Sequence, residues 1–153
     1  LREMQSASEI AYFLLEQTSQ IFERSMTLIL RNNELIAEKS FGIESDKAEG
    51  PSEPLRFKIQ IEDDGLISSV LKNGTLFYSA VDDKTIRESI FGEISAPDKS
   101  KILLLPLVAA GKTLALIYAD FGQSKEKKID TEYLESFAWL AGMAMDKLIR
   151  SRQ

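Results

Sequence analysis

Apolar residues follow a helical period at both ends of the chain and gather in short blocks in its middle. From Leu1 to Phe22 they recur at spacings of three and four, with Thr18 filling one gap: Met4, Ala7, Ala11, Leu14 and Ile21. This is the a/d pattern of an amphipathic helix. The segment from Asp130 to Arg150 is apolar on so much of its circumference that it needs more than one partner surface. We predict a long helix at each end, the second begun by Asp130 with Ile129 and Leu134 as a hydrophobic staple.

The two longest apolar blocks lie next to each other, between Lys101 and Gly122. Ile102 to Val108 is an almost unbroken apolar run, and Thr113 to Ala119 is a second run after the turn residues Gly111-Lys112. Two such runs around a short link that contains glycine predict a β-hairpin. Because its first strand has no polar face, we expect it in the middle of a sheet that is covered on both sides.

Shorter elements fill the rest of the chain. Asn32-Asn33-Glu34 predicts a tight turn between two strands, of which the second should lie near a sheet edge because only half of it is apolar. The predicted strands are Ser25–Arg31, Leu35–Phe41, Arg56–Ile61 and Thr75–Val81, and the predicted short helices are Leu66–Lys72 and Lys84–Ile94. The carboxylates of residues 62–64 and 82–83 should cap these helices, and Asn73-Gly74 should close the first. The loop of residues 42–54 should be flexible.

Composition then narrows the class of protein. The 153 residues are 44% hydrophobic and 28% charged, which is typical of one globular domain. A net charge of −5 argues against binding to nucleic acid or to anionic membranes, and no apolar run approaches the length of a membrane span. The lack of cysteine is compatible with a cytoplasmic location. Because the chain begins with Leu1, we expect residues 1–153 to be one domain of a longer protein that has further domains.

The chain contains no cysteine and no histidine, which removes most familiar catalytic groups. Thiol catalysis, Ser-His-Asp triads and His-based or Cys-based zinc sites are excluded. Gly111-Lys112-Thr113 ends like a phosphate-binding loop, but Pro106 stands where that motif needs glycine and a strand follows where it needs a helix. The acidic residues 62–64 lack the ligand spacing of a calcium loop. We therefore predict no catalytic residue and no metal site.

The order of the elements and several short sequence motifs resemble those of a GAF domain. Residues 64–70, DGLISSV, precede NGTLF at residues 73–77 and VDD at residues 81–83. Leu105-Pro106-Leu107, followed by Gly111-Lys112 and an aliphatic strand to Tyr118, is similar to the central hairpin of that family. The resemblance implies an α+β fold in which a central antiparallel sheet of about six strands carries both terminal helices on one face and a ligand pocket on the other. Proline in a central strand also predicts a pocket rim or a bulge near Pro106.

Known chemistries of the family can be tested by residue type. Bilin attachment and methionine sulfoxide reduction need cysteine, and haem binding normally needs histidine, so none of these cofactors or activities is expected. Cyclic-nucleotide members often carry an Asn-Lys pair and an Asp-Glu pair. The corresponding places here read Asp120-Phe121 and Asp130-Thr131, which weakens that interpretation without excluding it.

The resemblance implies a pocket on the face opposite the terminal helices. An apolar wall would come from Phe57, Ile59, Leu66, Phe77, Ile90, Phe91 and Tyr118, with Ser79, Arg87 and Asp120 as polar contacts. The same apolar side chains could equally form the core of any such fold, and Arg87 could be an ordinary solvated helix charge.

Two functions are favoured, and an enzyme that works through carboxylates or a Ser-Lys pair stays as a residual third without supporting spacing. The first is a non-enzymatic sensory or regulatory module of a bacterial-type signalling protein, flanked by signalling domains in the same chain, which binds a small molecule or relays signals through its terminal helices as a homodimer. The second is a degenerate domain with a filled core that acts only as a dimerisation scaffold. The N-terminal helix itself could be an ordinary packing helix or part of the dimer contact. The residues predicted to form the dimer interface are Met4, Ala11, Leu14, Trp139, Ala141 and Met145.

Overall fold

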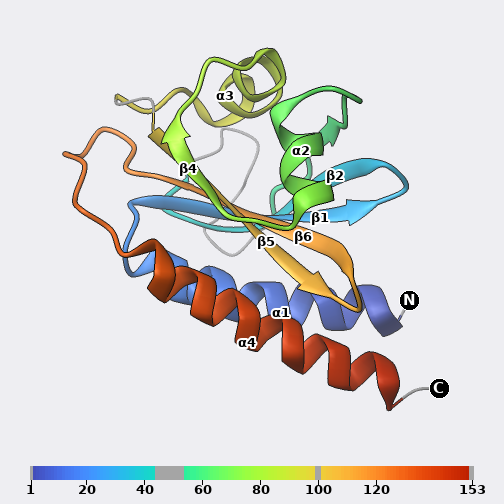
Figure 1. Cartoon of the computed structure of the whole chain (residues 1–153). Coiled ribbons are helices and arrows are strands. Elements are labelled where there is room, and N and C mark those ends of the chain that lie inside the picture. The colour runs from blue at the N-terminus through green and yellow to red at the C-terminus, as the bar shows by residue number, and fades with distance from the viewer. Residues whose placement is uncertain (1, 44–53, 99–100, 152–153) are drawn as a thin grey trace.

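The computed structural model is a six-stranded antiparallel sheet with helices on both faces (Figure 1). It describes residues 2–43, 54–98 and 101–151, with side chains from residue 6 onward, so most of the predicted flexible loop of residues 42–54 lies outside the described residues. In chain order the elements are α1 (Arg2–Ser19), β1 (Arg24–Arg31), β2 (Glu34–Phe41), β3 (Lys58–Gln60), α2 (Leu66–Asn73), β4 (Phe77–Ala80), the π-helix η1 (Ile86–Ile90), α3 (Phe91–Ile94), β5 (Lys101–Ala109), β6 (Lys112–Asp120) and α4 (Thr131–Arg150).

Two tight turns set the register of the sheet, whose strand order is β3-β2-β1-β6-β5-β4. Asn32 and Asn33 both have positive φ, 51° and 61°, so that Arg31 pairs with Glu34 across the β1–β2 turn. Asparagine tolerates this left-handed geometry, which matches the twist of the two strands. The predicted hairpin is therefore confirmed, and β2 lies one strand from the edge, beside the three-residue β3.

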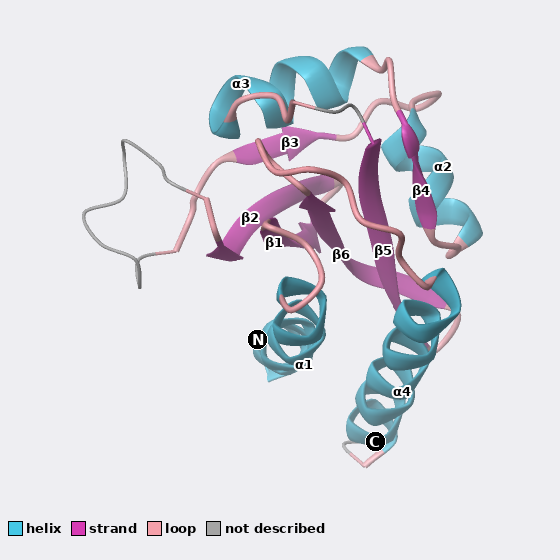
Figure 2. Cartoon of the chain, turned by 90° about the vertical axis from the view of Figure 1, so that its left-hand side faces the viewer, coloured by secondary structure: helices cyan, strands magenta, loops and turns pink. Residues whose placement is uncertain are grey.

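Helices α1 and α4 pack side by side on one face of the sheet, as Figure 2 shows end-on. Their buried side chains meet those of the central strands: Leu14 and Leu134 share a cluster with Leu103, Leu105 and Ile117. The predicted terminal helices are confirmed, although α1 ends at Ser19 before Phe22. Phe22 instead packs against Phe121 at a ring-centroid distance of 4.8 Å, beyond the end of the helix.

The short helices α2 and α3, with η1, cover the opposite face, and we call the apolar cluster beneath them the distal core. Both faces of β5 are buried, as its unbroken apolar run predicted. However, β5 lies next to the edge strand β4, which pairs with it only from Lys101 to Leu104. The apolar run therefore indicates that both sides of this strand are covered, but it does not indicate the position of the strand in the sheet.

The caps of the helices are partly as predicted. Asp130 Oδ1 accepts hydrogen bonds from the backbone N–H of Glu132 and Tyr133 at 3.0 and 3.3 Å, and Gly74 closes α2 at a φ of 65°. The prediction that residues 62–64 cap α2 is wrong, because its N-cap is Gly65 and no side chain of that acidic run bonds to it. Asp83 caps both short helices instead: its Oδ2 accepts from Leu66 N–H at 3.3 Å and its Oδ1 from Ile86 N–H at 3.0 Å.

Candidate functional site

The apolar residues of the predicted pocket wall do come together on the distal face. Ile59, Ile90 and Tyr118 are buried in the distal core, while Phe57, Leu66, Phe77 and Phe91 are half-buried against it. These side chains pack on one another and on their neighbours, so they form one apolar cluster between the sheet and the short helices. Two of the predicted polar contacts are not part of this cluster: Ser79 is exposed on β4, and Arg87 is exposed and forms an ion pair with Asp82 at 2.8 Å.

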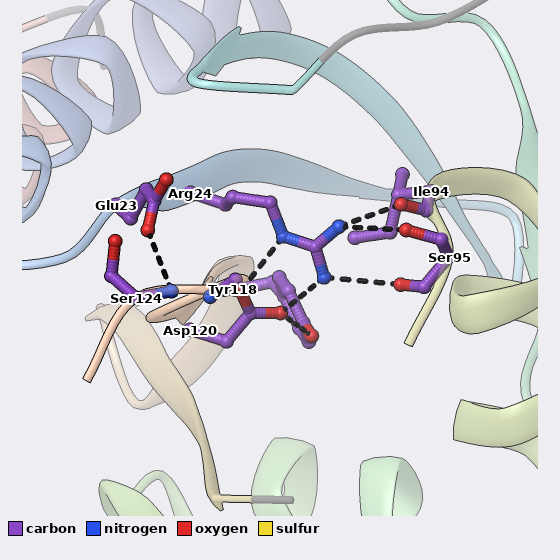
Figure 3. A network of polar contacts seen from close by, with 8 residues as sticks. Glu23, Arg24, Ile94, Ser95, Tyr118, Asp120 and Ser124 are labelled. Atoms are coloured by element: carbon purple, nitrogen blue, oxygen red, sulfur yellow. Dashed lines mark hydrogen bonds and ion pairs between the residues drawn. The ribbon is translucent and has the colours of Figure 1, made fainter. Parts of the chain in front are cut away.

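Asp120, predicted as a polar pocket contact, is instead the centre of a buried ion pair (Figure 3). Its carboxylate is fully buried and accepts two parallel hydrogen bonds from Arg24, Nε to Oδ1 at 2.8 Å and Nη2 to Oδ2 at 2.7 Å. Gly122 N–H donates to Oδ1 at 2.8 Å, and the hydroxyl of Tyr118 donates to Oδ2. Protein donors therefore surround the carboxylate, in the bidentate geometry that makes arginine–carboxylate pairs strong.

Arg24 also reaches the loop that follows α3. Its Nη1 donates to the carbonyl oxygen of Ile94 at 2.6 Å and to Ser95 Oγ at 3.2 Å, and its Nη2 donates to the carbonyl oxygen of Ser95 at 3.0 Å. The guanidinium is planar and carries five donors in a fixed fork, so it can hold a carboxylate and two carbonyl groups at once. Sequence reasoning did not identify Arg24; the only signal was a charged residue next to the predicted strand Ser25–Arg31, most of which is buried.

Burial and charge act together on the ionisable groups of this network. Burial raises the pKa of Tyr118 far above its ordinary value, and the negative charge of Asp120 and its hydrogen bond add to the effect. For Arg24, burial opposes the charged form, but the hydrogen bond and the charge of Asp120 outweigh it, so its pKa is raised. Arg24 therefore remains a cation and Tyr118 a neutral hydrogen-bond donor at ordinary pH.

Several large apolar side chains of the helix layer are exposed. We call this set the exposed helix face; its members and their exposed fractions are Phe13 (43%), Tyr133 (43%), Trp139 (65%), Leu140 (53%) and Met143 (50%). Phe137 joins the two helices beneath it, with ring centroids 6.3 Å from Phe13 and 4.8 Å from Tyr133. Exposed apolar side chains gathered in this way mark interaction surfaces more often than singly scattered ones do.

A groove of about 510 Å³ borders this face, between α4 and the β5–β6 hairpin. Trp139 and Met143 belong to both the groove and the exposed helix face, and Pro106 lies on the opposite wall. The sheet register shifts between Leu107 and Val108, so the predicted bulge near Pro106 is confirmed. The groove lies beside α4, whereas the resemblance implied a pocket on the other face of the sheet.

The residues predicted to form a dimer interface fall into two groups. Ala11, Leu14, Ala141 and Met145 are buried against the sheet and the partner helix of the same chain, so no second chain reaches them without opening this packing. Trp139 is exposed, and the side chain of Met4 lies outside the described residues. A helix period identifies which residues share a face, but it does not say which surface covers that face.

Within residues 2–43, 54–98 and 101–151, no group of three or more acidic side chains is arranged to hold a metal ion. None of the described helices combines the length and the apolar character that crossing a bilayer requires.

Comparisons with solved structures identify the fold. The second GAF domain of DevS from Mycobacterium smegmatis matches with a TM-score of 0.68 at 15% identity, covering 95% of this chain and 97% of that one. The GAF domain of a two-component sensor histidine kinase from Bacillus halodurans matches with a TM-score of 0.62 at 15% identity, covering 95% and 97%. The blue-light absorbing form of the Thermosynechococcus elongatus PixJ GAF domain matches with a TM-score of 0.69 at 11% identity, covering 100% and 92%.

No protein-family model matches the sequence, and no curated protein matches it. The structural likeness extends over nearly the whole chain at low sequence identity, so it establishes the fold: this is a GAF-like α+β domain. The resemblance stated from residues 64–83 and 105–118 is confirmed at this level. Sensory modules of signalling proteins typically carry this fold, which by itself is not tied to one ligand or output.

Proposed function

We propose that this domain is a non-enzymatic regulatory module that forms a homodimer through its terminal helices and relays conformational changes along them. The observation that carries the proposal is the exposed helix face, five large apolar side chains on α1 and α4 that the described residues leave 43–65% exposed. A second copy is the proposed partner, because the same patch on two chains can bury itself symmetrically. The match to a GAF domain of a two-component sensor histidine kinase supports a bacterial-type signalling context, for which we propose a cytoplasmic location.

The arrangement of the helices supports the relay. Figure 1 shows the start of α1 and the end of α4 at the same end of the helix layer. Phe13 and Phe137 connect the two helices, so a shift of one changes the surface that the other presents. In a dimer built from both helices of both copies, a displacement at the interface would therefore reach the start of α1 and the end of α4 together.

The distal core favours the alternative function, a dimerisation scaffold without a ligand. The predicted wall residues Ile59 and Tyr118 are fully buried in packed apolar contacts, and Asp120 is held by Arg24. A small molecule on this face would need the short helices to move away from the sheet. Both functions share the homodimer and differ in whether the distal core opens.

The test is native mass spectrometry of the purified chain and of two single-charge variants. Leu140→Glu places a carboxylate in the middle of the exposed helix face, and we expect the dimer signal to be lost while the circular dichroism spectrum is unchanged. Gly92→Glu is the matched control, since Gly92 is exposed on α3 with open space around it, and its dimer should persist. Charges at Ala141 or Met145 would disturb the chain's own core, so these variants would not distinguish loss of the dimer from loss of the fold.

Each outcome has a defined reading. A wild-type monomer, or a dimer that survives Leu140→Glu, would contradict the proposed dimer surface. A dimer that retains a defined extra mass would favour the ligand-binding version of the proposal, whereas a dimer at the bare polypeptide mass would favour the scaffold.

A further inference from the structure

One edge of the sheet has an open side. β4 is the outermost strand beside β5 and pairs with it from Phe77 to Ala80, as Figure 2 shows at the end of the sheet. Backbone N–H and C=O groups alternate between the two sides of an antiparallel strand, so about half of those in β4 point away from β5. No described segment forms backbone hydrogen bonds with that side. Such an edge can accept one more strand.

A basic hollow of about 420 Å³ adjoins this edge, between the start of β5 and the linker that leads to α4. Its charged side chains are those of Lys101, Lys127, Lys128 and Glu126, and we call it the lysine hollow. Three lysines and one glutamate give it a net charge of +2, in a chain whose net charge is −5. All three lysines are exposed, and none forms an ion pair with a described residue. The lysine hollow therefore offers unneutralised positive charge to an anionic partner.

Tyr78 connects the open edge to the lysine hollow, because it belongs to β4 and also lines the hollow. It pairs with Leu103, two residues after Lys101, so the side chains of Tyr78 and Lys101 lie on the same face of the sheet. Lys101 Nζ lies over the Tyr78 ring, 5.6 Å from its centroid, which is a cation–π contact. A strand added beside β4 would place every second side chain on this face, next to Tyr78 and the lysine hollow.

We propose that the edge of β4 and the lysine hollow together bind an extended acidic segment of a partner protein, which adds a strand to the sheet. Backbone pairing with β4 would provide affinity, and acidic side chains at alternate positions would contact the lysines and provide specificity. The net negative charge of the chain does not prevent this, because charges farther away than about 8 Å are largely screened at physiological salt. The proposed surface shares no residue with the exposed helix face, so it goes beyond the proposed homodimer.

The first test measures the contribution of charge. The probe is a dye-labelled peptide of alternating glutamate and threonine, titrated with the full chain and followed by fluorescence anisotropy at about 20 mM salt. We expect a Kd below about 1 mM, and binding at least about fivefold weaker in the double variant Lys127→Gln/Lys128→Gln. The matched control is Lys72→Gln/Lys84→Gln, which removes the same charge from two exposed lysines on the other side of the sheet and should bind as the wild type does.

The second test measures the contribution of the backbone. Two further peptides have the same sequence, one with N-methyl groups on every glutamate and the other on every threonine. Only alternate residues of an added strand direct their N–H groups toward β4, so methylation should block pairing in one of these peptides and leave the other able to bind. We expect their affinities to differ by at least about tenfold. In the complex with the unmethylated peptide, amides of residues 77–80 should exchange with deuterium at least about fivefold more slowly, while those of α2 should not change.

Several results would overturn this proposal. No binding at about 1 mM peptide, or equal affinity for the two methylated peptides, would exclude an added strand. If tripolyphosphate displaces the labelled peptide as efficiently as unlabelled peptide does, the lysine hollow binds anions without regard to their backbone. A dimer of the Leu140→Glu chain that the peptide disperses would make a second copy the occupant of this edge. Peptide binding that is unchanged in a monomeric Leu140→Glu chain would support the proposal and separate it from the homodimer.

Discussion

Replacing Gly142 with alanine is a sharp test of how α4 packs on the sheet. In a helix of unknown surroundings this change should stabilise the fold by about 1 kcal/mol, because alanine is the better helix former. In this structure the expected change in stability has the opposite sign. An ideal Cβ at Gly142 would lie 2.2 Å from the carbonyl oxygen of Val108, a separation that real Cβ atoms essentially never show. The obstacle is a backbone atom of β5, so it cannot rotate away.

The magnitude follows from what must move. To restore ordinary contact, α4 has to shift from β5 by about 1 Å, which loosens the packing of Ala141 and Met145 on either side. Overpacking of this kind costs about 1–3 kcal/mol, and the helix-propensity gain offsets part of it. We expect a net loss of about 1–2 kcal/mol, equivalent to a fall in Tm of about 2–8 °C for a domain of this size.

Urea unfolding followed by circular dichroism measures this change, and the fluorescence of Trp139, the only tryptophan in the chain, reports the displacement of α4. Gly92→Ala is the control, because Gly92 lies in α3 with nothing within 4 Å of its ideal Cβ. That variant should gain about 0.5–1 kcal/mol. A Gly142→Ala chain as stable as the wild type, or more stable, would refute the close approach of α4 to β5.

Two further predictions concern the buried network and the shared cap. Above pH 10 the phenol of Tyr118 ionises in the unfolded chain but stays protonated when folded, so its contribution to stability falls by about 1.4 kcal/mol per pH unit. Urea midpoints between pH 9 and 11.5 should therefore decline less steeply in Tyr118→Phe, whereas the exposed Tyr133→Phe control should follow the wild type; equal slopes in all three chains would contradict this. Asp83→Ala should lower stability by about 1–2 kcal/mol, since it uncaps two helices, and Asp82→Ala should change it little; similar losses in both variants would count against the shared cap.

Much of the architecture could be predicted from local signals. Asn32-Asn33 specifies its turn because both residues tolerate positive φ, and Gly74 and Asp130 mark helix ends through their own backbone and side-chain chemistry. The unbroken apolar run of β5 predicted burial on both faces. Each of these inferences depends on a pattern of residues within a few positions of one another, so a short stretch of the sequence contains the whole signal.

The site could be predicted less fully than the elements, because its residues meet only when distant parts of the chain pack together. The apolar wall residues were correctly placed on one face, but whether they line a cavity or fill it depends on how closely α2 and α3 approach the sheet. Asp120 reads as a polar residue at the end of a strand, and only its pairing with Arg24, 96 residues away, turns it into a buried structural charge. Trp139 and Met145 both looked like interface residues on α4, yet one is exposed and the other buried.

The sequence by itself determined the order and type of the elements, the ends of several helices and the absence of cysteine and histidine chemistry. The tertiary structure decided which apolar faces cover each other, which carboxylate caps α2, and why Gly142 stands in α4. The physical reason is the range of the interactions. Backbone preference and periodicity are properties of adjacent residues, whereas burial, ion pairing and steric fit are properties of surfaces that exist only after distant segments have packed together.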